Sequence, residues 1–342
     1  MSSSFFSPVE ASVLSKVGSM RQVAGIRRAV LDDGKERGLR VAEFRNGGGL
    51  AFTVLLDRGL DIADASFGGV SLAFMGPGSF GHPAHYDAAG LGWLRNWGGG
   101  LLTGCGLRSV GAPSEFDGEA LGLHGRLSNT PAEDVKCYEE WTSSRYILSL
   151  SGTMREARLF GENLTLTRRI TTEFGVNTIT IADTVRNCGF RPSHATLLYH
   201  MNFGWPLIDT GTVIEAVPHE VVPRDGVAAA GLDAWSKFQE PDSNYKEQCF
   251  YHDIPTGSNG MASIALHNPA LGLKVLLAYR KAELPFLTQW KNAGSGEYVM
   301  GIEPGNCHVE GPAAERDKFK SLRILQPGES FETHLELSVF RV

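Results

Sequence analysis

Apolar and polar residues alternate with a period of two along much of the chain, as in strands that bury one face. The clearest alternating runs lie at residues 146–150, 164–166, 179–181 and 335–339. Two further stretches, 273–279 and 299–302, are more continuously apolar and are expected to be core strands. The pattern predicts a mainly β protein with antiparallel sheets.

The N-terminal segment predicts one short helix. Ser7, Pro8 and Glu10 combine an N-cap serine, a proline at the first helical position and a glutamate at N3. This helix is expected to end near Gly18. A hairpin and a third strand are then expected at residues 26–31, 39–44 and 50–56.

Between residues 75 and 130 the alternation breaks, and Gly, Pro, His, Trp and Asn dominate. A long irregular stretch of this kind inside a compact β protein is usually functional. The chain has no fixed-period repeat and no Pro/Ser-rich linker. We therefore expect one large β domain over residues 1–342, with a short helical segment at 1–20.

Composition and charge narrow the function classes. The net charge is -6, and Lys and Arg are scattered, so we expect no nucleic-acid partner. There is no apolar run of the ~18 residues that a membrane span needs. The N-terminus has no secretory pattern, and five widely spaced cysteines are typical of free thiols. These features predict a cytoplasmic protein.

Three short stretches offer candidate chemistry. His124 lies after Gly122-Leu123 and before Gly125, His200 ends an apolar run, and Glu303 ends another before a Pro-Gly turn. A base, a proton donor and a further polar group are the minimum set for opening and closing a sugar ring. Taken singly, each residue fits a structural role equally well, as a bonded loop histidine, a core histidine or a buried ion pair.

Taken together and in this order, the three stretches resemble the aldose 1-epimerase, or galactose mutarotase-like, family. Residues 56–62 and the glycine-rich stretch 97–106 look like a less characterised branch of it. The resemblance implies a galactose mutarotase-like supersandwich of antiparallel sheets, with the active site in a concave cleft. It implies that Glu303 is the general base, His200 the general acid and His124 a holder of a substrate oxygen. No metal or organic cofactor is needed for this reaction.

The resemblance defines the substrate-binding groups less well. The family usually has a second glycine where Arg126 stands, and its arginine near the first histidine has Arg108 as an uncertain counterpart. Its substrate-gripping aspartate has only Asp242 as a weak counterpart. Gln289 and Trp290 could bind sugar instead, because an indole suits the C–H face of a pyranose and an amide can serve two hydroxyls.

Asn202 and His308 are further candidates for the same cleft, because each lies close in sequence to a catalytic candidate. The expected partner is a small sugar, bound by a monomer or homodimer, and the sugar itself stays open. Asp57, Arg58 and Asp61 are interpreted as a structural ion-pair or turn cluster, with the alternative that Asp57 and Arg58 face the cleft.

Two other functions remain open at this point. The chain could be a non-catalytic carbohydrate-binding or sensing protein on the same fold, which would keep the tryptophans and lose the acid–base geometry. It could also be a metal-dependent sugar isomerase that uses His82, His85, His308 and Glu310 as ligands.

Overall fold

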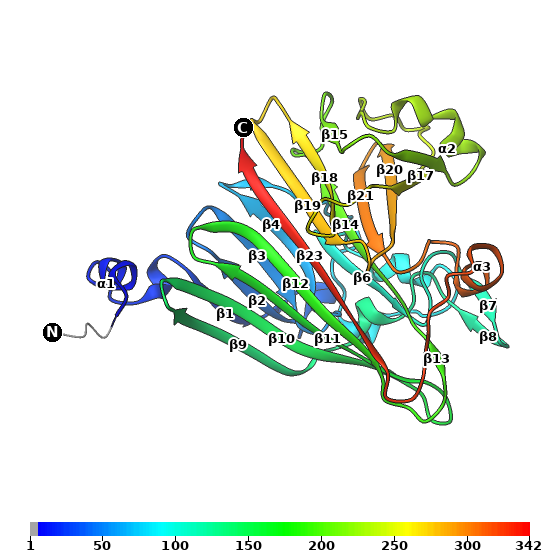
Figure 1. The fold of residues 1–342 in the computed structure, drawn as a ribbon, viewed down its shortest axis with the longest axis horizontal. Coiled ribbons are helices and arrows are strands. Elements are labelled where there is room, and N and C mark those ends of the chain that lie inside the picture. Colours follow the sequence, from blue (N-terminus) through cyan, green and yellow to red (C-terminus); the bar gives the residue numbers. More distant parts are fainter. Residues whose placement is uncertain (1–5) are drawn as a thin grey trace.

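The structure is a computed structural model and describes residues 6–342. Its described strands form two large antiparallel sheets and two small ones (Figure 1). The larger sheet, called sheet 1, has eleven strands in the order β1-β2-β3-β4-β6-β14-β21-β20-β17-β16, with β5 paired to β4. Its strands are β1 (Gly25–Val30), β2 (Arg40–Arg45), β3 (Leu50–Leu55), β4 (Asp61–Phe67), β5 (Val70–Ser71), β6 (Leu102–Leu107), β14 (Thr196–Gly204), β16 (Glu220–Pro223), β17 (Gln248–Asp253), β20 (Phe286–Gly294) and β21 (Glu297–Gly305).

The second sheet, sheet 2, has eight strands in the order β15-β18-β19-β23-β12-β11-β10-β9. These strands are β9 (Glu133–Thr142), β10 (Arg145–Ala157), β11 (Asn163–Glu173), β12 (Val176–Asn187), β15 (Val213–Glu215), β18 (Met261–Asn268), β19 (Leu273–Arg280) and β23 (Ser330–Arg341). The two small sheets pair β7 (Ser114–Phe116) with β8 (Glu119–Leu121) and β13 (Ser193–His194) with β22 (Ile324–Leu325).

Helices are few and short. The α-helices are α1 (Pro8–Leu14), α2 (Gly226–Ala230) and α3 (Pro312–Ala314). Single turns of other helix types are η1 (Met20–Gln22), η2 (Gly34–Glu36), η3 (Pro83–His85), η4 (Gly92–Asn96), η5 (Leu127–Asn129), η6 (Leu232–Ala234) and η7 (Glu315–Phe319). None of the helices in residues 6–342 has the length and apolar character that crossing a membrane requires.

The local predictions at the N-terminus are confirmed for residues 6 onward. Ser7 caps α1 in a complete capping box with Glu10, and Pro8 opens the helix, which ends at Leu14 rather than near Gly18. Strands β1 and β2 form the expected hairpin, with Ile26 opposite Phe44, and β3 follows. Residues 1–5 of the expected helical segment lie outside the described residues.

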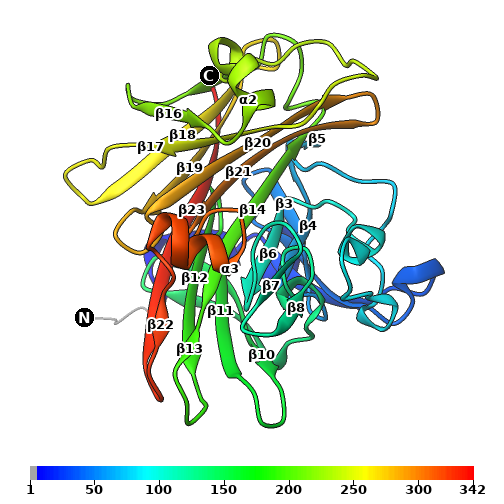
Figure 2. The same cartoon turned by 90° about the vertical axis from the view of Figure 1, so that its right-hand side faces the viewer.

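The main core lies between the facing sides of the two sheets. The alternation predicted from sequence is confirmed: Leu148 and Leu150 on β10 and Leu335 and Leu337 on β23 are buried. Strand β14 differs from these half-buried strands, because every one of its residues is buried. It lies between β6 and β21 in sheet 1, and Figure 2 shows β14, β21, β20, β17 and β16 side by side. Successive β14 side chains therefore point into the core and into a second buried region.

All five cysteines are free thiols, as the spacing predicted. The predicted mainly antiparallel β architecture is confirmed. The irregular stretch 75–130 contributes only short strands and single helical turns around β6. This stretch supplies one wall of the cavity described next.

Candidate active site

His200 and Glu303 lie on neighbouring strands and point to the same face of sheet 1. Strands β14 and β21 pair with Met201 opposite Ile302, so the residues on either side of this pair share a face. His200 Nε2 lies 3.2 Å from Glu303 Oε1. Both side chains are almost fully buried, at 5% and 1% exposure. The structure thus brings together the two residues predicted to be catalytic.

A glycine makes room for the Glu303 carboxylate. A Cβ at Gly301 would lie 2.4 Å from Glu303 Oε1 and 3.1 Å from Trp290 Cβ. No side chain fits at such a distance without displacing the carboxylate. This steric demand explains a glycine inside a strand, where glycine otherwise costs stability.

Burial shifts both groups toward their neutral forms. It raises the pKa of Glu303 well above its usual range, with a smaller contribution from Glu247, while Arg224 opposes the shift. Burial also lowers the pKa of His200 to about 4. Glu303 Oε1 and His200 Nδ1 have no hydrogen-bond partner among the described residues. The 3.2 Å contact of Oε1 with His200 Nε2 is an ion-pair distance without hydrogen-bond geometry. Because both unpartnered atoms belong to residues that line one cavity, a ligand there could supply their missing partners.

His124 is held in place by backbone on both sides. It has a φ of 57°, and its amide donates to Gly111 O while its carbonyl accepts from the Gly106 amide. The Gly111 amide donates to His124 Nδ1 at 3.3 Å. Because Nδ1 accepts this bond, the neutral ring carries its proton on Nε2.

The two histidine rings meet edge to face, with centroids 5.4 Å apart. Burial lowers the pKa of His124 to about 3, and His200 contributes to the same direction. His124 is therefore a neutral hydrogen-bond donor beside the His200–Glu303 pair. This places it where it could hold a ligand oxygen.

These residues line a cavity of about 290 Å³ whose walls include three tryptophans. The Trp93 and Trp97 rings stack with centroids 5.3 Å apart, and Trp97 lies 6.0 Å from Trp290. Their indole N–H groups donate within the protein, to Ser128 Oγ, Thr103 Oγ1 and Glu247 Oε2, respectively. The rings are thus fixed and present flat apolar faces, which suit the C–H face of a sugar ring.

Three further residues line the cavity and lie in no motif that the sequence made visible. Arg224 follows β16, Glu247 precedes β17, and Cys249 lies on β17. Arg224 Nη1 donates to Cys249 Sγ, and Arg224 Nη2 lies 3.7 Å from Glu247 Oε1. Burial raises the pKa of the Cys249 thiol above its usual range, so it is not a ready nucleophile.

Asp242 does not line the cavity. It is exposed, and its carboxylate accepts from the Asn244 amide within its own loop. Glu247, five residues further along, is the carboxylate that reaches the cavity from this part of the chain. Asp242 as the counterpart of the family's aspartate is therefore wrong.

Gln289 and Trp290 point to opposite faces of β20. Trp290 lines the cavity, whereas the Gln289 side chain accepts from His252 Nε2 and donates to Trp235 O. Adjacent strand residues face opposite ways, so the two could not both contact one ligand. The placement of Gln289 in the sugar site is wrong for this reason.

Arg108 lies in another cavity. Its guanidinium contacts Ser193 Oγ, His194 Nδ1 at 3.0 Å and Glu119 at 3.6 Å. Strand β6 ends before Arg108 and carries it past the His200–Glu303 pair. The prediction that it binds substrate in the cleft does not agree with this placement.

Asn202 and His308 also lie away from the cavity lining. Asn202 Nδ2 donates to the carbonyls of Gly100 and His200, so it ties β14 to the loop before β6. The His308 ring stacks on Phe319 and its Nδ1 lies 3.2 Å from Glu315 Oε1. Neither side chain lines the cavity.

The residues considered as metal ligands are not gathered together. His82 Nδ1 accepts from the Ala84 amide, and Glu310 pairs with Lys318. Within residues 6–342 no group of three or more His, Cys, Asp or Glu side chains is arranged to hold a metal ion.

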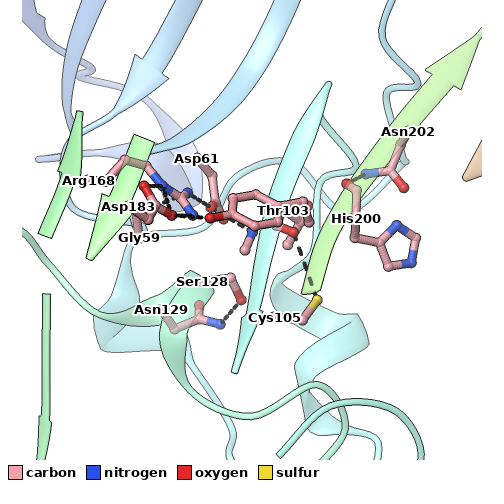
Figure 3. A network of polar contacts seen from close by, with 12 residues as sticks. Gly59, Asp61, Thr103, Cys105, Ser128, Asn129, Arg168, Asp183, His200 and Asn202 are labelled. Carbon is pink, nitrogen blue, oxygen red and sulfur yellow. Dashed lines mark hydrogen bonds and ion pairs between the residues drawn. The ribbon is translucent and has the colours of Figure 1, made fainter. Parts of the chain in front are cut away.

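The cluster interpreted as structural has ion-pair partners. Asp57 accepts from Arg40 Nε at 2.8 Å, while Arg58 donates to Gly81 O and to Asn129 Oδ1. Asp61 accepts from the Gly104 amide and lies 3.5 Å from Arg168. In Figure 3, Arg168, Asp183 and Asp61 lie on one side of the strand that carries Thr103, and His200 lies on the other side.

Comparison with known proteins assigns the chain to a family. A model described as a domain of unknown function, DUF4432, matches residues 36–339. The chain belongs to the DUF4432 family. A search of curated proteins finds no match to this sequence.

Solved structures share the fold of this DUF4432 chain. A Klebsiella pneumoniae protein, provisionally described as an aldose 1-epimerase, is 28% identical, with a TM-score of 0.87 over 92% of this chain and 83% of its own. A galactose mutarotase-like protein from Clostridium acetobutylicum is 13% identical, with a TM-score of 0.65 over 94% and 100%. A galactose 1-epimerase from Lactobacillus acidophilus is also 13% identical, with a TM-score of 0.59 over 93% and 99%. The galactose mutarotase-like fold implied by the sequence is confirmed.

Proposed function

We propose that this protein is an aldose 1-epimerase-like enzyme that interconverts the anomers of a sugar by opening and closing its ring. The observation that carries the proposal is the buried His200–Glu303 pair, 3.2 Å apart, with unpartnered polar atoms in an aromatic cavity. The pair lies in the cavity lining together with His124 and three tryptophans, where a sugar could supply the missing partners. The similarity to proteins described as aldose 1-epimerases supports the same reaction.

The reaction needs one proton taken and one given. Glu303 takes the proton from the anomeric hydroxyl, and the O1–H electrons form the C1=O1 double bond. The C1–O5 bond breaks, and its electrons take a proton from His200 to give the O5 hydroxyl. The open aldehyde rotates about C1–C2, and reversal of the same transfers closes the ring on the other face. Base and acid must flank one C1–O5 unit at hydrogen-bonding distance.

The shifted pKa values suit a pair that holds one proton in total. The pKa of Glu303 is raised and that of His200 is lowered to about 4, so both groups resist carrying charge. With one proton between them, one member accepts and the other donates. Substrate hydroxyls that replace the missing hydrogen bonds favour the ionised form, Glu303 carboxylate with His200 imidazolium.

The remaining cavity groups position the sugar. His124 Nε2–H donates to a substrate oxygen, because its Nδ1 is already occupied by the Gly111 amide. The fixed faces of Trp97 and Trp290, with centroids 5.9 Å and 5.4 Å from the His200 ring, receive the C–H face of the pyranose. Glu247 and Arg224, which line the same cavity, offer further hydroxyl-binding groups.

The Glu303→Gln substitution tests the proposal. It keeps the shape and removes the base, so anomer exchange measured by NMR saturation transfer on a panel of aldoses should slow by about 10²- to 10⁴-fold. Glu310→Gln, a glutamate outside the cavity that pairs with Lys318, is the matched control and should keep the wild-type rate. Sugar binding without faster exchange in the wild type would contradict the proposal and favour a carbohydrate-binding protein.

Chelation separates the proposal from a metal-dependent isomerase. Because every proton transfer uses protein side chains, dialysis against EDTA should leave the exchange rate unchanged. A rate lost on chelation and restored by a divalent ion would contradict this mechanism. The measurement is the exchange rate before and after chelation, with Mg²⁺, Mn²⁺ and Zn²⁺ added back in turn.

A further inference from the structure

The walls of the cavity differ sharply in polarity. One wall is formed by sheet 1 and its adjoining ends, and it carries His200, Glu303 and the Arg224–Glu247 pair. The other wall, called the loop side, is formed by loops, and His124 belongs to it. Apart from His124, the loop side is built from apolar groups. Its non-aromatic members are Leu91, Leu94, Ala112, Pro113, Leu123 and Val309.

Three backbone amides of this apolar wall already donate within the protein. The amides of Leu94, Ala112 and Leu123 donate to the carbonyls of Leu91, Val309 and Gly90, respectively. Proline at position 113 has no amide hydrogen. The indole N–H groups of the three cavity tryptophans are also used within the protein. A sugar hydroxyl placed against this wall would therefore lose its water partners without gaining a donor in return.

The wall also leaves apolar surface open to a ligand. Leu91 is 60% exposed and Leu94 48% exposed, although both line the cavity. Exposed large apolar side chains that border a pocket with a few convergent polar groups are typical of a ligand-binding surface. Covering them requires an apolar part of the ligand near the mouth of the cavity.

Charge in the cavity argues against an acidic ligand. The Arg224 guanidinium lies 3.0 Å from Asp225 and 3.7 Å from Glu247, so two carboxylates already neutralise it. A phosphate or carboxylate on the sugar would meet like charges without a free cation.

An apolar group on the anomeric oxygen is not compatible with the reaction. A glycoside has no anomeric hydroxyl proton, so its ring does not open by the transfers described above. The apolar part of the substrate must therefore lie elsewhere on the ring. We infer that the preferred substrate is an uncharged deoxy sugar, in which a methyl group replaces the hydroxymethyl group and lies against Leu91 and Leu94. This inference rests on the proposed anomer exchange.

Matched sugar pairs test the inference. Anomer-exchange rates are measured by NMR for 6-deoxy-glucose against glucose, fucose against galactose, and rhamnose against mannose, each pair of the same configuration. The best deoxy sugar should exceed its hydroxymethyl partner in kcat/KM by about 3- to 10-fold, because a hydroxyl at this partly open wall loses only part of its contact with water. Glucose 6-phosphate and glucuronate should react more slowly than any neutral sugar that is turned over.

A pair of Leu94 variants tests whether the apolar wall causes the deoxy preference. Leu94→Asn adds a hydrogen-bonding group and should reduce the deoxy preference at least threefold, whereas Leu94→Met should keep it.

Equal or faster turnover of the hydroxymethyl partners by the wild type would overturn the inference and leave the epimerase activity standing. If the wild type accelerates exchange of no sugar, the proposed function fails. Saturation-transfer binding of the same pairs to the wild type then decides, and binding without a deoxy preference, or no binding, overturns the inference.

Discussion

Two polar clusters lie on opposite faces of β14 and differ in how fully they are satisfied. On the core side, Arg168 makes three hydrogen bonds to Asp183, at 2.8–3.1 Å, and one to Gly59 O. Tyr199 donates to Asp183 Oδ2 at 2.7 Å and contacts Thr333 Oγ1. Arg168 is fully buried, and none of these side chains has an unpartnered polar atom. This cluster is called the core network below.

The cavity side begins one residue later, at His200. Here the His200–Glu303 contact leaves Glu303 Oε1 and His200 Nδ1 without hydrogen-bond partners among the described residues. Burial is similar on both sides of β14, so burial alone does not separate the two clusters. Hydrogen bonding separates them. Every polar side-chain atom of the core network has a partner within the protein, whereas the cavity pair has two atoms that a ligand could still bond. Alternate side chains of β14 thus enter a fully hydrogen-bonded core network and a cavity pair with unpartnered atoms.

The largest stability effect should come from the core network. Replacing Arg168 by Met leaves Asp183 and Asp61 without their cation, which should lower the free energy of unfolding by about 3–5 kcal/mol. Urea unfolding followed by fluorescence measures the loss. Arg169, exposed on the opposite face of β11, is the matched control, and Arg169→Met should change stability by less than about 0.5 kcal/mol. A loss below about 1 kcal/mol in Arg168→Met would contradict a structural role for the network.

Two buried groups, His200 in the cavity pair and Asp61 beside the core network, should make stability respond to pH with opposite signs. The raised pKa of Glu303 acts in the same direction as that of Asp61. The pKa of His200 is about 4 in the folded protein, below its unfolded value of ~6.5, so the unfolded chain binds a proton first as the pH falls. His200 therefore costs stability as the pH drops from about 6.5 to 4, by about 2 kcal/mol at pH 5. Burial raises the pKa of Asp61 to about 7, so its contribution is present below pH ~4 and is lost as the pH rises to 7.

Two variants separate these pH effects. The free energy of unfolding, measured with urea between pH 5 and 7, should fall less toward pH 5 in His200→Gln than in the wild type. Asp61→Asn should remove the loss that grows with rising pH, and Asn can still accept from the Gly104 amide. Unchanged pH profiles in both variants would show that these buried groups do not carry the shifts assigned to them.

The sequence predicted the cavity pair because its members follow apolar runs and precede turn-forming residues. The expectation that they end their strands is wrong, because β14 continues to Gly204 and β21 to Gly305. His124, His200 and Glu303 could be placed by motif and order, and the aromatic stretch around Trp93 and Trp97 by its broken alternation. Arg224 and Glu247 could not, because they flank short strands in a region without motifs and reach the cavity only through the fold.

The mistaken placements share one physical cause, which is the register of strands and loops. Gln289 is next to Trp290 in sequence but faces the other side of β20. Arg108 lies close to His124 in sequence, yet β6 carries it beyond the cavity. Asp57 and Asp61 pair with Arg40 and Arg168, as the structural interpretation expected. The Arg40 partner comes from the neighbouring strand of sheet 1 and the Arg168 partner from sheet 2, and neither could be identified from sequence. Alternation in the sequence predicts which residues of a strand share a face. It does not predict which neighbouring strand or loop that face contacts.

The smallest effect should come from Trp290→Phe. Phenylalanine keeps an aromatic face for the sugar and removes the N–H that donates to Glu247 Oε2 at 2.7 Å. Loss of one such hydrogen bond to a partly exposed carboxylate should weaken sugar binding by less than about tenfold. Trp290→Ala, which also removes the face, should weaken it further. Equal effects of the two variants in NMR titrations would mean that the face contributes nothing.

The most direct test compares neighbours on β14 in the same two assays. His200→Gln should slow anomer exchange by about 10²-fold or more while changing the free energy of unfolding at pH 7 by less than about 1 kcal/mol. Tyr199→Phe should lower the free energy of unfolding by about 1–3 kcal/mol, through loss of its bonds to Asp183 and Thr333, and leave the exchange rate of the folded protein within about threefold. The account predicts this crossed pattern. An exchange rate that survives His200→Gln, or that falls as far in Tyr199→Phe, would contradict the division of β14 into a catalytic and a structural face.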